Sequence, residues 1–277
     1  MGVFFALVRK QLGETRWPLV VLAASLFAMS WLTVFVTCRM ERRFKKETDV
    51  AAVMRNRAFL RGMGGGSMDY SSGSIELAFW NHPFLIIAIV IWPIGRASAA
   101  IAGEIERGTI DLVLSRPISR TTYLGSQIAV MLIGLLILAL ALVAGNLAST
   151  IYNPVEKPPG AFQLIDPLAN LIALCLCCYG FTVFVSAIDI VRWRANLFGA
   201  FVTLASYVIH VVANIPSLEN VKFLDHFSIF KAYDPVGAFA EGGPKLAFNV
   251  EILLAIAAVG IVASFVAFRY RDVPSNS

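Results

Sequence analysis

Long apolar stretches alternate with polar ones along this chain, which predicts a bundle of membrane-spanning helices. A helix of about twenty mostly apolar residues crosses about 30 Å of hydrocarbon. Six stretches have this length and character, and they cover residues 17–37, 83–102, 127–150, 167–188, 196–215 and 250–268. We therefore predict an all-α integral membrane protein in which residues 1–277 form a single transmembrane domain with both termini on one side.

The segment before the first span, residues 1–16, has an amphipathic pattern. It places Phe4, Leu7, Val8 and Leu12 on one side of a helix, with charged residues elsewhere. This pattern is typical of a helix that lies in the membrane interface. The span that follows is too long for a signal-peptide core and is expected to be retained.

Three polar segments between the spans are long enough to carry more than a turn. Residues 38–82 begin with a basic run, continue into a Gly/Ser-rich stretch, and end in an apolar-aromatic piece (75–80) that is expected in the interface. Residues 103–123 are rich in charge, and residues 216–248 form a long loop before the last span.

Composition agrees with a membrane protein. Hydrophobic residues make up 58% of the 277 residues and charged ones 15%, whereas soluble domains have about 45–50% and about 25%. The net charge of +5 lies next to apolar spans, where anionic headgroups attract bases, so it does not indicate nucleic-acid binding. The four cysteines do not form a disulfide framework. Cys175 and Cys178 could form a soft-metal site, although packing is the simpler interpretation.

The charged segment between the second and third spans predicts a short, capped helix at the membrane surface. The seven residues 109–115 follow Gly108 and precede Arg116 and Pro117, and they are enough for about two helical turns. The Thr109 hydroxyl can accept from free amides of the first turn. Helical spacing then places three apolar residues on one face: Ile110, Val113 and Leu114. Such a helix suits docking onto another protein.

This segment also carries a family resemblance. The string EIERGTIDLVLSRPISR at residues 104–120, followed by Tyr123 and Gly125, resembles the signature of ABC type-2 transporter permeases. In that family the segment is a coupling helix that fits into a groove on a separate ATPase subunit. The resemblance implies an ATPase-coupling role for the following residues: Glu104, Glu106, Arg107, Gly108, Thr109, Ile110, Asp111, Val113, Leu114, Arg116 and Pro117.

The resemblance also implies an architecture and partners. Residues 1–16 resemble the family's elbow helix, and residues 226–239 resemble its outer segment before the last span. The implied machine is an exporter, or another ABC-driven device, in the bacterial inner membrane. It contains two ATPase copies, which bind ATP and Mg²⁺, and a second permease subunit that makes a homodimer or a related pair.

Charge alone does not orient the chain. With the N-terminus inside, the inner segments hold 11 of the 23 Lys and Arg residues and the outer segments hold 12. The positive-inside rule therefore gives no decision. Because the resemblance requires segment 103–123 to face the ATPase, we expect cytoplasmic termini, with 38–82 and 216–248 outside.

Motifs that the sequence lacks limit the possible classes of function. The chain contains no Gly-Lys pair and hence no P-loop, so any ATPase must be a separate chain. An ATP-independent secondary transporter or channel is the main alternative, although such proteins usually show internal repeats or acids at the bilayer midplane. A membrane-embedded enzyme would need a polar catalytic cluster, and the spans show no paired carboxylates at helical spacing.

Four polar residues within the spans are candidates for lining a transport path: Arg96, Asn146, His210 and Asn214. For Arg96 the simpler expectation is that it snorkels or pairs with an acid such as Glu104. For the other three it is structural hydrogen bonding between helices.

Overall fold

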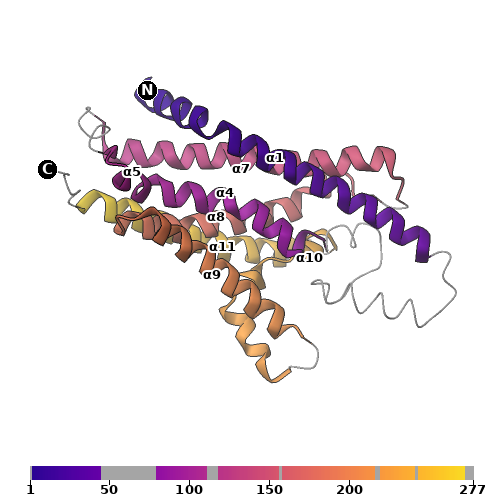
Figure 1. Cartoon of the computed structure of the whole chain (residues 1–277). Helices are drawn as coiled ribbons and strands as arrows, with labels where there is room; N and C mark the ends of the chain where they lie inside the picture. The colour runs from indigo at the N-terminus through magenta and orange to yellow at the C-terminus, as the bar shows by residue number, and fades with distance from the viewer. Residues whose placement is uncertain are drawn as a thin grey trace.

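Six long helices form the bundle in a computed structural model of the chain, shown in Figure 1. The structure describes residues 2–44, 79–110, 118–155, 158–215, 219–240 and 243–271. The six helices within these ranges that are long and apolar enough to span a membrane are α1 (Gly2–Phe44), α4 (Pro83–Ala100), α7 (Arg120–Tyr152), α8 (Ile165–Ile188), α9 (Arg192–Ala213) and α11 (Gly243–Tyr270). This confirms the all-α multi-pass fold. The two termini lie at the same end of the bundle as α5 (Ala102–Glu106), the short helix after α4 (Figure 1).

Helix α1 runs without interruption through the predicted boundaries at residues 16 and 38. The segment 1–16 is therefore not a separate elbow helix, and the helix continues into the predicted outer loop as far as Phe44. The reason is that one face continues along the whole helix: Val8, Gln11, Leu19 and Leu26 are all buried and recur at intervals of three to eight residues.

Helix α7 packs along α1. The amide of Gln11 in α1 donates to the Ser126 hydroxyl in α7. Further along, a Cβ added to Gly145 of α7 would lie 2.3 Å from the Phe27 carbonyl oxygen of α1. Absence of a side chain at Gly145 therefore lets the two backbones touch.

Helix α4 begins at a local cap. The 3₁₀ helix η1 (Phe79–Asn81) leads to His82, whose ring nitrogen Nδ1 accepts from the Phe84 amide, with Pro83 in the first turn. Trp80 of η1 is fully buried within the protein. Residues 75–78 of the piece that was expected in the membrane interface lie outside the described residues, so this expectation stays a prediction.

Helix α8 forms the centre of the bundle and contacts both α4 and α11 (Figure 1). Gly180 in α8 faces Ala257 and Gly260 in α11: a Cβ on Gly180 would lie 2.7 Å from the Ala257 Cα. Cys175 and Cys178 are fully buried in this helix, and no cluster of metal-ligating residues occurs in the described part of the chain. The complete burial of the two side chains agrees with a packing role.

The segment before α11 is folded rather than an open loop. It contains the 3₁₀ helices η2 (Glu219–Phe227) and η3 (Ile229–Ala232) and the short helix α10 (Pro235–Ala240). The buried Asn170 of α8 holds this segment against the bundle. Its side-chain amide donates to the Ala232 carbonyl and accepts from the Asp234 main-chain amide. The last span starts at Gly243, earlier than the predicted residue 250.

Candidate functional site

The backbone breaks between α4 and α5, and Ser186 of α8 compensates for the break. Ile101 has φ −126° and ψ −60°, which ends α4. The amides of Ile101 and Ala102 then donate to the Ser186 hydroxyl, at 3.3 and 3.0 Å, and this hydroxyl donates to the Ser98 carbonyl. The short helix α5 is thereby attached to the central helix of the bundle.

A tight turn ends α5 at Gly108. The Gly108 amide donates to the Ile105 carbonyl and the Thr109 amide to the Glu104 carbonyl, which is the Schellman pattern of helix ends. Gly108 has φ 67°, the only positive φ among the described residues. The turn therefore depends on glycine, because other L residues rarely adopt this conformation.

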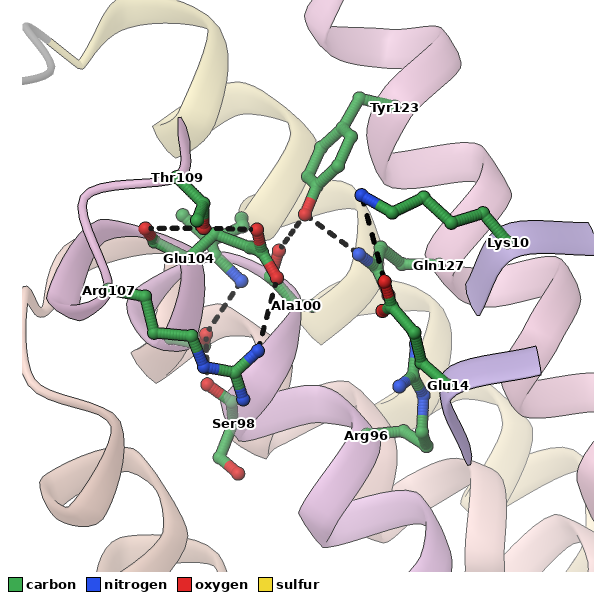
Figure 2. Close-up of polar contacts among 12 residues, drawn as sticks. Lys10, Glu14, Arg96, Ser98, Ala100, Glu104, Arg107, Thr109, Tyr123 and Gln127 are labelled. Atoms are coloured by element: carbon green, nitrogen blue, oxygen red, sulfur yellow. Dashed lines mark hydrogen bonds and ion pairs between the residues drawn. The ribbon is translucent and has the colours of Figure 1, made fainter. Parts of the chain in front are cut away.

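Glu104 closes the turn from within α5 (Figure 2). Its carboxylate accepts from the Thr109 hydroxyl at 2.6 Å and lies 3.6 Å from the Arg107 guanidinium. The predicted pairing of Glu104 with Arg96 is therefore wrong. The Thr109 hydroxyl points back to α5, and its predicted role as a cap for residues 109–115 cannot be followed, since Asp111, Val113, Leu114, Arg116 and Pro117 lie outside the described residues.

Glu106 connects α5 to the start of α9. Its carboxylate accepts from the main-chain N–H of Arg192, the first residue of α9, at 2.8 Å. The N-cap residue of α9, Val191, has no capping side chain of its own. Glu106 thus supplies an acceptor and a negative charge at a helix N-terminus, where both are stabilising.

Arg96 is linked to the end of its own helix by way of α7 (Figure 2). Its guanidinium donates to the side-chain oxygen Oε1 of Gln127 at 2.5 Å. The side-chain nitrogen Nε2 of Gln127 donates to the Tyr123 hydroxyl at 2.7 Å, and this hydroxyl donates to the Ala100 carbonyl at 2.9 Å. This chain of hydrogen bonds joins α7 to the last turn of α4, immediately before the break.

Arg120 and Arg271 were not among the predicted site residues, but each caps the end of a helix near α5. Arg120 at the start of α7 donates to the Phe268 and Arg271 carbonyls at the end of α11. Arg271 donates to the Ala187 and Asp189 carbonyls at the end of α8. Burial lowers the pKa of Arg271, and Asp189 opposes this change. Cations at helix C-termini are favourable, but no local pattern reveals a cap from a distant helix.

The remaining predicted residues lie elsewhere. Ile110 is only 2% exposed and packs in the protein's own core, which does not fit a role in filling a partner's groove. Asn146 is buried inside α7. The Nδ1 atom of His210 lies 2.7 Å from Oδ1 of Asp225 in η2, and this contact joins α9 to η2. The side-chain amide of Asn214 donates to the His210 carbonyl within the same region of the chain. Of the four path candidates, Arg96 alone lies at the α5 end.

These contacts make the α5 end of the bundle one connected unit. Helix α5 is tied to α8 by Ser186 and to α9 by Glu106, and the end of α4 is tied to α7 by Tyr123. Four of the spanning helices, α4, α7, α8 and α9, are thus joined by hydrogen bonds at or next to α5.

One comparison with known proteins gives a match. A family model described as ABC-2 family transporter protein matches residues 7–273, nearly the whole chain. No curated protein and no solved structure gives a significant match.

Proposed function

The chain belongs to the ABC-2 transporter family, and on this premise we propose that it is the permease subunit that couples ATP hydrolysis by a separate ATPase to export or conformational work. The family membership and the six spanning helices make it a multi-pass membrane protein of an ABC transporter. The proposal concerns the coupling, the direction of work and the composition of the complex.

The observation that carries the proposal is the attachment of α5. A helix that receives motion from an ATPase must transmit it, and the Ser186 and Glu106 bonds give α5 rigid connections to α8 and α9. The residues after Gly108 would then form the coupling helix, with Val113 and Leu114 on the docking face. Since Ile110 is buried, its role would be to anchor this helix to the bundle.

The complex we propose contains two permeases and two ATPases, which bind ATP and Mg²⁺. Six spans supply half of a gated path, and transport requires two arrangements of a complete one. The α5 end, with both termini, would face the cytoplasm of a bacterial cell, so that the coupling segment meets the ATPases.

Co-purification tests the proposal. The tagged permease is extracted in mild detergent from cells that also express the ABC ATPases of its source, and the native mass of the complex is measured. We expect two copies of a P-loop ATPase with two permease copies, or with one copy and a related permease. An active transporter without an ATPase would favour the ATP-independent alternative and remove the proposal.

Replacing Gly108 with valine should weaken the complex without removing any side-chain contact. A left-handed conformation costs a β-branched residue about 1–2 kcal/mol, so recovery of the ATPase should fall about five- to thirtyfold. Gly108→Asn is the matched control, because asparagine tolerates this conformation. Equal recovery with both variants would show that the turn at Gly108 does not position the coupling segment.

A further inference from the structure

A cleft of about 320 Å³ opens beside the α5 region and is not explained by coupling. Its walls come from α1, α4 and α7, with Arg107 at the end of α5 and Arg192 at the start of α9. Figure 2 shows two of its wall residues, Arg96 and Glu14, on facing helices. The cleft therefore lies between α1 and the rest of the bundle, at the membrane end that carries both termini.

The lining changes from charged to apolar with depth along the helices. On α1 it passes from Gln11 and Glu14 to Pro18 and Leu22, and on α4 it passes from Arg96 back to Trp92 and Ile91. In both helices the polar residues are nearer the α5 end and the apolar ones nearer the middle of the span. Half of the Ile91 side chain is exposed, so the apolar part opens to the flank of the bundle. A ligand that fits this gradient has a polar head and an apolar tail.

Two polar atoms in the wall have no hydrogen-bond partner among the described residues. They are Nε of Arg96 and Oε1 of Gln11. Gln11 is 7% exposed, and its Nε2 donates to Ser126 Oγ, whose own proton goes to the Tyr123 carbonyl. This arrangement fixes the amide orientation, and it leaves one buried donor and one buried acceptor without a partner in the wall of the cleft. Buried polar groups normally have hydrogen-bond partners, because a buried group without one is unfavourable.

The cations of the cleft exceed its available anions. Glu104 is engaged by Thr109 and Arg107, and Glu14 lies 3.7 Å from Lys10. Among the described residues, no carboxylate lies within ion-pair distance of the side chain of Arg96 or of Arg192. Arg96 donates from one guanidinium nitrogen to Gln127, but neither guanidinium forms an ion pair in the described part of the chain. Guanidinium groups are well suited to phosphate oxygens.

We propose that this cleft binds a phospholipid of the leaflet at the α5 end, with the phosphate held by Arg96 and Arg192 and an acyl chain along Leu22, Ile91 and Trp92. A lipid in this position connects α1 to α4 and α9 beside the coupling segment, and its binding does not require the ATPase. Net negative lipids are preferred, because the two guanidiniums are the uncompensated charges.

Lipid binding to single variants tests the site. Purified protein in detergent is titrated with phosphatidylglycerol, phosphatidylcholine or inorganic phosphate, and bound molecules are counted by native mass spectrometry while the melting temperature is recorded. We expect phosphatidylglycerol to bind and stabilise, and Arg96→Gln to lower its affinity about tenfold, the effect of losing a charge-assisted hydrogen bond. Arg192→Gln, at the half-buried rim, gives the same test if Arg96→Gln fails to fold.

Arg194→Gln is the matched control, because Arg194 is two residues after Arg192 in the same helix but does not line the cleft. Its side chain is exposed and pairs with Asp189. Its affinity for phosphatidylglycerol should equal that of the wild type. If it loses as much affinity as Arg96→Gln, the binding is general surface attraction and the site is refuted. If inorganic phosphate stabilises as strongly as phosphatidylglycerol, the ligand is a free phosphate and the lipid assignment is wrong.

Discussion

Replacing Gly180 with leucine should abolish recovery of folded protein. A Cβ at this position would lie 2.7 Å from both the Cα and the carbonyl oxygen of Ala257, and one on Gly260 would lie 2.4 Å from the Gly180 carbonyl carbon. Real contacts of this kind do not occur, so α8 and α11 would have to separate. Overpacking costs about 1–3 kcal/mol where side chains can adjust. Here the obstacle is backbone, and the cost should reach a large part of a total stability of about 5–15 kcal/mol.

Size-exclusion chromatography of a fluorescent fusion, followed by a melting curve, measures this effect. Gly13→Leu is the control, because Gly13 is exposed and a Cβ added there would meet no atom within 4 Å. It should give a normal monodisperse peak. A Gly180→Leu variant with a normal peak and an unchanged melting temperature would mean that α8 and α11 are not packed backbone to backbone.

The close contact at Gly180 illustrates what could not be predicted from the sequence. Six spans are predictable because a long apolar run is a local property, and all six were found. Their ends were less accurate, since helices extend beyond the hydrocarbon: α7 has 33 residues, about 50 Å at 1.5 Å per residue. Which glycine of a span faces which helix depends on the packing of the whole bundle, and no local pattern gives it.

In the candidate site, too, the features with a local cause were predictable and the contacts between distant residues were not. The Gly108 turn was predictable, because a glycine that ends a polar helical segment has a local cause. The partners of the charged residues were not. Arg96 binds Gln127, 31 residues away, and Arg120 caps a helix 148 residues away. Pairing Arg96 with the nearest acid in sequence was wrong because Glu104 is already engaged by Thr109 and Arg107.

Reversing the charge of Glu106 should uncouple hydrolysis from transport. Glu106→Lys removes the acceptor for the Arg192 amide and places a positive charge at the N-terminus of α9, whose first turn already contains Arg192 and Arg194. Loss of the cap together with an unfavourable helix-dipole interaction should cost about 1–2 kcal/mol. Helix α9 would then no longer follow α5. Under the proposed function we expect substrate-stimulated ATPase activity to fall about tenfold, while the permease still inserts and gives a normal chromatographic peak.

Glu106→Gln separates the two physical contributions. Glutamine keeps an oxygen that can accept from the Arg192 amide but has no charge, so it should retain most of the stimulated activity if the capping bond is what connects α5 to α9. If Glu106→Gln is as defective as Glu106→Lys while complex recovery also falls, the carboxylate acts by attracting the ATPase instead. If Glu106→Lys behaves as wild type in both measurements, α5 is only a solvated connector, and α9 receives its motion by another route.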